Sequence, residues 1–403
     1  MPTDYNINFT TVTTGTFDPN SQRVINLDGN RFLHVGYQDS GAAVPNSTGL
    51  VGQVVTVPTD GSTPTTAGAT QILLGTVGIF TLQKISADRI LILYGDVNNR
   101  AQVNSIVVTV SGNVITPATA VNNLFGGFNL NAYKASFRLL ANGNLFCKSV
   151  ANFDDTDTNF TSDTISIRTG EMTFSGNQIT RYTNFNDYKN NTTQVFAASR
   201  TILSNSNPPE NSPVFYDIPG STDFWDGEYH VRYDQNGNVV SESTGVDPAP
   251  SEWRSVPWSS DGFIAFNGGG GQYRFQPDNT RPDTWMQSTW GSNSNTDTDI
   301  PIYDIMPIDD TTFLIVHANS WSQSIRFTGS LFARSVQVAS VGLTLSGDSQ
   351  STLGSSQQVT PGGGAEWAYD FMAPRGPQGV QLAADRFVYF TYNATGAIAH
   401  VFE

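Results

Sequence analysis

One arrangement of hydrophobic and polar positions recurs seven times along this chain of 403 residues. An apolar residue is followed by a short polar turn, and an apolar strand begins five positions after that first residue. The clearest copies are Leu27–Phe32 and Ile85–Ile90. The other copies pair Leu140 with Leu145, Ala197 with Ile202, Trp258 with Phe263, Ile308 with Phe313, and Leu382 with Phe387. A repeat of about 55 to 60 residues is typical of one four-stranded blade of a β-propeller.

Each copy divides into expected β-strands, as the second copy illustrates. Its strands are expected at 80–85, 89–94, 102–110 and 114–116. The turn Ser111-Gly112-Asn113 between the last two contains residue types that adopt positive φ at low cost. Runs of β-branched and aromatic residues alternate with Asn, Asp and Gly along the chain, and no amphipathic helix is evident. The sequence therefore predicts an all-β fold.

The two ends of the sequence predict how the repeat is completed. The last copy has expected strands at 379–382, 386–392 and 397–402 but lacks a fourth. Residues 5–9 alternate apolar and polar side chains ahead of the first copy, so we expect them to pair with the C-terminal strand. We predict a single β-propeller domain over 1–403 with seven four-stranded blades, in which 1–20 form the closing strand and an arm. Six blades or another β architecture are the alternatives.

The spacing of the copies is uneven in two places. The first strands of the fifth and sixth copies are only about 50 residues apart, which predicts a short fifth blade. Residues 346–364 are rich in Ser, Gln and Gly and have no apolar pattern. We predict that they form an exposed loop between the last two copies.

Composition and charge disfavour several classes of partner. Hydrophobic residues make up 38% of the chain, and 25 Phe, 14 Tyr and 7 Trp can supply a large core. The formal net charge of −15 repels nucleic acid and anionic membranes, so neither is an expected partner. No apolar run reaches the roughly 20 residues needed to span a bilayer. The N-terminal residues lack the basic and apolar regions of a signal peptide, so we expect synthesis in a cytoplasm without export.

Four tryptophans are the candidate binding residues. They lie in polar surroundings rich in Gly, Asn and Ser: Trp225, Trp285, Trp290 and Trp321. An exposed aromatic face can stack on a sugar or anchor a protein interface, whereas the alternative is that these rings cover blade edges.

Metal and thiol chemistry have weaker candidates. An acidic loop that contains Asp154, Asp155 and Asp157 is a weak calcium candidate, because it lacks the spacing and the glycine of an EF-hand. The segment 234–238 is predicted to be a hairpin turn rather than a calcium loop. Cys147 is the sole cysteine and is predicted to be a buried thiol within a strand.

Catalytic motifs are not found in this sequence. The four histidines lack metal-ligand spacing, and neither a GxSxG nor an HExxH motif occurs. Paired carboxylates could support glycoside hydrolysis, but no pair stands out among 35 acidic residues. We therefore predict no catalytic residues and no cofactor.

The repeat style, the lack of an export signal and the composition rich in Asn, Thr and Gly resemble virion β-propellers of bacteriophages. The resemblance covers the whole chain but provides no motif from which functional residues can be transferred. It implies a non-enzymatic structural protein of the virion, attached to the tail or capsid in a symmetric multi-copy assembly with other virion proteins. One face would be available for a host-surface glycan or protein. The alternatives are a lectin-like glycan-binding propeller and a carbohydrate-active enzyme.

Overall fold

The structure is a computed structural model, and its contacts divide the chain into two compact units. The larger unit comprises residues 3–192 and 372–403, and the smaller unit comprises 1–2 and 193–371. The structure describes residues 3–10, 22–37, 49–75, 77, 80–95, 103–121, 135–152, 165–190, 215–218, 221–226, 231–242, 254–259, 262–266, 271–275, 286–287, 302–307, 312–318, 331–338, 351–353, 357–358, 379–383, 386–393 and 396–402.

The larger unit contains four sheets in its described part. The first sheet consists of β2 (Gln22–Asp28), β3 (Arg31–Tyr37), β4 (Gly49–Thr56), β5 (Thr65–Thr66) and β6 (Thr70–Leu74). The second consists of β7 (Phe80–Ser86), β8 (Arg89–Gly95), β9 (Val103–Ser111) and β10 (Val114–Pro117). The third consists of β11 (Ala135–Leu139), β12 (Leu145–Asn152), β13 (Ile165–Ser175) and β14 (Gln178–Asn190). The last sheet consists of β28 (Gly379–Ala383), β29 (Arg386–Asn393), β30 (Gly396–Phe402) and β1 (Thr3–Asn8).

The smaller unit contains three further sheets in its described part. The fourth sheet consists of β15 (Phe215–Asp217), β16 (Phe224–Asp226), β17 (Val231–Tyr233) and β18 (Val239–Glu242). The fifth consists of β19 (Arg254–Ser259), β20 (Gly262–Phe266), β21 (Gly271–Phe275) and β22 (Met286–Gln287). The sixth consists of β23 (Ile302–Pro307), β24 (Thr312–Ala318), β25 (Leu331–Val338), β26 (Ser351–Leu353) and β27 (Gln357–Gln358).

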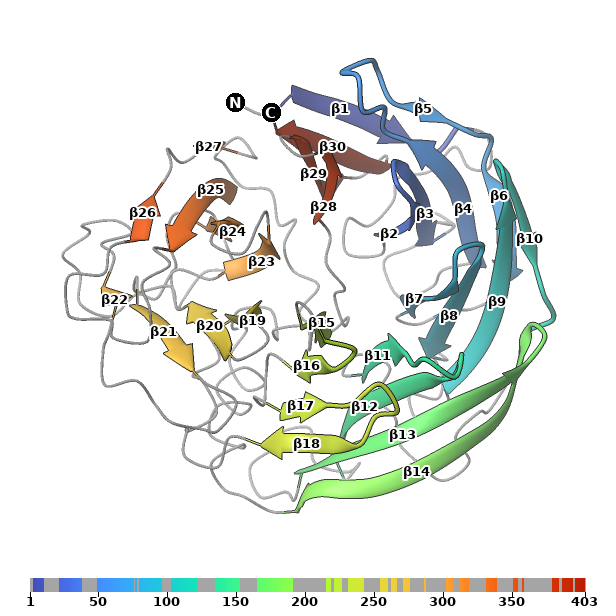
Figure 1. Cartoon of the computed structure of the whole chain (residues 1–403). Helices are drawn as coiled ribbons and strands as arrows, with labels where there is room; N and C mark the ends of the chain where they lie inside the picture. The colour runs from blue at the N-terminus through green and yellow to red at the C-terminus, as the bar shows by residue number, and fades with distance from the viewer. Residues whose placement is uncertain are drawn as a thin grey trace. The chain divides into compact units, whose positions relative to one another are not determined.

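The strands of each sheet pair antiparallel, and nearly all of them pair in sequence order (Figure 1). Within the larger unit, β2 contacts β7 and β7 contacts β11. Within the smaller unit, β15 contacts β19 and β19 contacts β23. Successive sheets of a unit are therefore joined through their first strands, which is the arrangement of neighbouring propeller blades. Among the described residues, no helix has the length and apolar character needed to cross a membrane.

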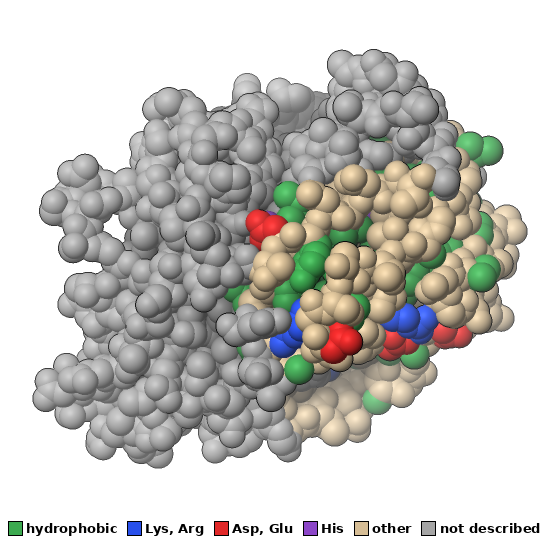
Figure 2. Space-filling model, turned by 90° about the horizontal axis from the view of Figure 1, so that it is seen from above, with side chains coloured by type: hydrophobic (Ala, Val, Ile, Leu, Met, Phe, Trp, Pro, Cys, Tyr) green, Lys and Arg blue, Asp and Glu red, His purple; other side chains and the backbone are tan. Residues whose placement is uncertain are grey.

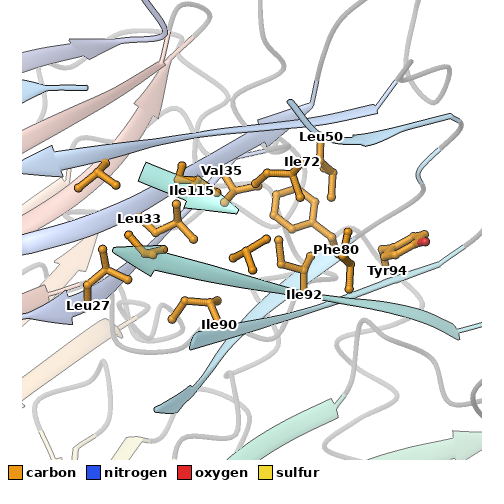
Figure 3. Close-up of a cluster of buried hydrophobic side chains, with 14 of the residues drawn as sticks. Leu27, Leu33, Val35, Leu50, Ile72, Phe80, Ile90, Ile92, Tyr94 and Ile115 are labelled. Atoms are coloured by element: carbon orange, nitrogen blue, oxygen red, sulfur yellow. The ribbon is translucent and has the colours of Figure 1, made fainter. Parts of the chain in front are cut away.

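The second strand of the first sheet is buried on both faces. Phe32, Leu33 and Val35 lie in one nearly continuous apolar run, and all three are buried. Continuous apolar runs, unlike alternating ones, are expected where both faces of a sheet are covered. Leu33 and Val35 pack in the core between the first and second sheets (Figure 3). Phe32 packs in a separate core between the first and last sheets.

Arginines at equivalent turns join three pairs of neighbouring sheets. Each is the first residue of the second strand of its sheet, and each donates a hydrogen bond to the next sheet. Arg31 donates to the carbonyl of Gly112 at 2.7 Å, and Arg386 donates to the carbonyl of Thr59 at 3.3 Å. Arg89 binds the carbonyl of Gly176 and, at 2.9 Å, the Oδ1 of Asn177. The arginine position of the repeat thus forms a contact between sheets.

We expect Arg89 and Asn177 to be energetically coupled. The variants Arg89→Ala, Asn177→Ala and the double variant should reveal a coupling of about 0.2–1 kcal/mol in the free energy of unfolding, because the pair is solvent-exposed. Urea denaturation measures the free energy of unfolding of all three variants. The control combines Arg89→Ala with Asp60→Ala. The native Asp60 carboxylate binds Ser62 and not Arg89, so the stability changes of these two variants should be additive. Full additivity of the Arg89 and Asn177 variants would contradict the contact.

The structure agrees closely with the strands expected in the second and last copies. The expected strand 114–116 is observed as β10, and the expected strand 397–402 is observed as β30. The expected partner of the C-terminal strand is also present, because β1 pairs antiparallel with β30 from Thr3–Val401 to Asn8–Gly396. The prediction that 1–403 form one domain stays a prediction.

One expectation differs from the structure, and another lies outside the described residues. The expected fourth copy at Ala197 and Ile202 is the latter. The first two described strands of the fourth sheet flank Ile218, whose amide donates a hydrogen bond to the carbonyl of Asp223. This turn separates the buried Ile218 and Phe224 by six positions instead of five, so the five-residue spacing misses it. The expected loop 346–364 contains β26 and β27, which both pair with β25.

Candidate functional site

A buried polar cluster interrupts the apolar core of the first sheet. Its members are Gln22 on β2, His34 on β3 and Gln53 on β4, and all three are fully buried. His34 and Gln53 lie opposite each other in the strand register. Phe32 and Ile90 hold equivalent positions of the repeat, so the equivalent pair in the second sheet is Ile92 and Ile106. The first sheet therefore has polar side chains where its neighbour has isoleucines.

The hydrogen bonds of the polar cluster assign its donors and acceptors. The carbonyl of Asn8 can only accept, so the Nε2 of Gln53, 3.0 Å away, is the donor. The same Nε2 lies 3.4 Å from the Nδ1 of His34, which is therefore an acceptor. The proton of the imidazole then resides on Nε2, which donates to the Oε1 of Gln22 at 2.9 Å. The cluster thus links the backbone of Asn8 to the first strand of the first sheet.

Burial keeps His34 neutral. Because a charged imidazole loses its hydration there, burial lowers the pKa of His34 to about 3. The ring of Phe9 stacks on the imidazole with a centroid distance of 4.3 Å. A neutral imidazole with a hydrogen-bond partner at each nitrogen is suited to positioning its neighbours rather than to proton transfer near neutral pH.

We expect replacement of His34 by glutamine to flatten the pH dependence of stability. Between its folded pKa of about 3 and its unfolded pKa of 6.5, the unfolded chain binds more protons at this position. Stability therefore falls as the pH decreases through this window, by up to about 1.4 kcal/mol per pH unit. His34→Gln removes this contribution but keeps a donor and an acceptor. Equal slopes for both proteins in urea denaturation between about pH 6.5 and pH 4 would contradict a buried neutral imidazole.

The residues that meet the polar cluster belong to a segment at the start of the chain. This N-terminal segment, Thr3–Thr10, lies beside β30 (Figure 1). The hydroxyl of Tyr5 donates to the carbonyl of Gly61 at 3.4 Å, and the hydroxyl of Thr10 donates to the carbonyl of Ala67 at 3.3 Å. Ile7 packs in the core between the first and last sheets. The segment thus contacts both the first sheet and the last sheet.

Two glycines allow the N-terminal segment to approach closely. A Cβ at Gly396 would lie 2.0 Å from the carbonyl oxygen of Ile7, and one at Gly36 would lie 3.0 Å from the ring of Phe9. On the other face of the last sheet, the Oδ1 of Asp4 lies 2.8 Å from the Nδ1 of His400. The His400 side chain is 1% exposed and that of Asp4 is 50% exposed. We call the set of residues that receives the segment (His34, Gly36, Gln53, Gly61, Ala67, Gly396 and His400) the docking site.

The residues predicted to bind a ligand are not brought together by the described part of the chain. Trp225 lies on β16, opposite Tyr216 on β15 and Arg232 on β17. Trp285, Trp290, Trp321 and the acidic residues Asp154, Asp155 and Asp157 lie outside the described residues. Among the residues that are described, no group of three or more His, Cys, Asp or Glu side chains could hold a metal ion.

The predicted hairpin turn at 234–238 is confirmed. The carboxylate of Asp234 accepts hydrogen bonds from the backbone amides of Asn236 and Asn238 at 2.8 and 2.9 Å. Gly237 has a φ of 85°, a conformation that glycine adopts without strain. The carboxylate therefore stabilises the turn between β17 and β18. The backbone of Cys147 lies in β12, as expected.

The sequence predicted that the N-terminal segment pairs with the C-terminal strand, but not the side chains of the docking site that contact it. The signal was present in the alignment of the first two copies, where His34 stands in the place of Ile92 within an apolar strand. The contacts of Asn8 and Phe9 with Gln53 and His34 depend on how two sheets pack, and no local pattern predicts them.

Comparison with known proteins gives matches to solved structures alone. No protein-family model and no curated protein matches the chain. The WD40 β-propeller domain of Doa1 is 10% identical, with a TM-score of 0.41 and coverage of 98% of this chain and 96% of that one. A protein of unknown function from Dyadobacter fermentans is 11% identical, with a TM-score of 0.39 and coverage of 99% and 97%. Sqt1 of Saccharomyces cerevisiae is 10% identical, with a TM-score of 0.38 and coverage of 96% and 97%.

Proposed function

We propose that this chain is a non-enzymatic structural protein of a bacteriophage particle, built as one seven-bladed propeller. The pairing of β1 with β30 supports this proposal most strongly, because it adds residues 3–8 as the fourth strand of the last sheet. In a blade completed in this way, β1 covers the edge of β30 that would otherwise be open. Outside the cell, an unfolded copy is neither assisted by chaperones nor replaced by new synthesis, so a scaffold that resists fraying suits such a role.

The described surface is compatible with assembly from many copies. Figure 2 shows its charged side chains as small separate groups among polar, backbone and hydrophobic atoms. Charged residues make up only 14% of the chain. Like-charge repulsion between neighbouring copies is therefore spread over a largely uncharged surface. In this proposal the protein is attached to the tail or capsid, and loops at one end of the propeller face the host.

Analysis of purified particles tests the proposal. We expect the chain in particles made by the phage that encodes it, in a fixed stoichiometry measured by quantitative mass spectrometry. A reconstruction of the particle should place it in symmetric copies with extensive interfaces. Absence from purified particles, despite synthesis during infection, would contradict the proposal.

Glycan binding is the second candidate function, favoured by the row of residues across the fourth sheet. This row places Trp225 between Tyr216 and Arg232 in the strand register. Aromatic and planar cationic side chains are common in sugar recognition. Glycan-array binding should then be lost in Trp225→Ala or in Trp285→Ala with Trp290→Ala, and retained in the control Val240→Ala. Binding unchanged by these tryptophan variants would contradict this function.

A further inference from the structure

The contacts that hold the N-terminal segment are made by residues far along the chain. Gln53 is 45 positions from Asn8, Gly61 is 56 positions from Tyr5, and His400 is 396 positions from Asp4. The segment is therefore bound to the docking site in the manner of a peptide that adds a strand to a sheet edge. Residues 11–21 connect it to β2, and an extended stretch of that length could reach about 35–40 Å.

The docking site recognises the sequence of the segment at several positions. Gly396 and Gly36 leave room for the backbone of Ile7 and the ring of Phe9, respectively. Ile7 is buried, whereas the neighbouring Asn6 and Asn8 are exposed. The buried His400 pairs with Asp4, and the buried Gln53 donates to the carbonyl of Asn8. The contacts of Asp4, Ile7 and Phe9 involve side chains and therefore depend on the sequence of the segment. None of the contacts requires a covalent link to the same molecule.

We propose that the N-terminal segment is an exchangeable strand, and that the docking site also receives this segment from a second copy of the chain. Exchange preserves every contact described above, so its cost is the loss of free motion of the two molecules. Release of the segment exposes Ile7 and removes the partners of the buried Gln53 and His400, and the same segment from a second copy restores each of these contacts. Wherever copies are held close together, their high local concentration favours exchange. The proposal does not depend on a role in a virion.

Disulfide trapping in the full-length chain tests the exchange. Asn6 and Ile398 lie directly opposite each other in the β1–β30 register, at a separation that cysteines can bridge. In a Cys147→Ser background, one chain carries Asn6→Cys and another carries Ile398→Cys. The two are produced together in one cell, oxidised, and separated by size without reductant. We expect a disulfide-linked product of two chains that disappears on reduction.

Three further proteins make the outcome decisive. Asn6→Cys produced with Val114→Cys, which is 63% exposed on β10, controls for random surface crosslinks and should give no two-chain product. Addition of Ile7→Asp to the Asn6→Cys chain should reduce the product to that background, because the carboxylate cannot enter the core. A chain with both Asn6→Cys and Ile398→Cys reports docking within one molecule. An internal disulfide in that chain, with no product between the single variants, would overturn the proposal.

Discussion

Replacement of Phe390 by alanine lowers the free energy of unfolding by about 3–5 kcal/mol. Phe390 on β29 is 1% exposed and packs in the core between the first and last sheets. Its ring meets that of Phe32 edge to face, with centroids 4.9 Å apart. The substitution removes the buried area of one ring and leaves a cavity that rigid strands on both sides cannot close. Urea denaturation followed by tryptophan fluorescence measures the change.

A matched substitution and a double variant separate this effect from general sensitivity. Val240→Ala alters a residue that is 52% exposed, so it should change stability by less than about 0.5 kcal/mol. The variants Phe390→Ala, Phe32→Ala and their combination should reveal a coupling of about 0.5–1.5 kcal/mol between the two rings. If Phe390→Ala were as mild as Val240→Ala, the packing of the last sheet on the first would be wrong.

Replacement of Gly396 by alanine should detach the N-terminal segment from β30. The added Cβ would lie 2.0 Å from the carbonyl oxygen of Ile7 and 3.0 Å from the Cα of Asn8. Backbone atoms cannot move aside by a rotamer change, so β1 must shift away from its partner. We expect amide hydrogens of residues 3–8 to lose their protection from exchange, with a stability loss of about 1–3 kcal/mol. Hydrogen exchange followed by mass spectrometry measures the protection.

The control for this variant lies on the facing strand. Asn6 is exposed and is opposite Ile398, so Asn6→Ala adds no clash and should preserve the protection of β1. Protection of residues 3–8 that remained intact in Gly396→Ala would show that the glycine is not required for the approach of the segment.

The strands were predictable from the sequence because their signals are local. The second copy has turns at Ala87–Asp88 and at Gly112, and Gly112 has a positive φ of 56°. The apolar runs between these turns could therefore be assigned to β7, β8, β9 and β10 with small errors at their ends. The turn between β15 and β16 was not recognised, because its buried residues Ile218 and Phe224 are six positions apart instead of five.

The contacts between sheets were not predictable, because they join residues that no local pattern relates. Nothing near Arg31 in the sequence indicates that its guanidinium reaches the carbonyl of Gly112. Likewise, a histidine in an apolar strand is compatible with many environments. The partners of His34 became evident only once β1, β2 and β4 were placed around it. The docking of residues 3–10 was thus predicted as a strand pairing, whereas its side-chain recognition was not.

The pairing of β1 with β30 has a consequence for synthesis on the ribosome. Asp4 is made 396 residues before His400, which at about 5–20 residues per second is a delay of about 20–80 s. During translation, β1 therefore waits without its partner, when an apolar strand would invite aggregation. Its sequence Thr-Asp-Tyr-Asn-Ile-Asn is mostly polar and has Ile7 as its sole aliphatic side chain. A nascent strand of this composition can remain hydrated until β30 leaves the ribosome.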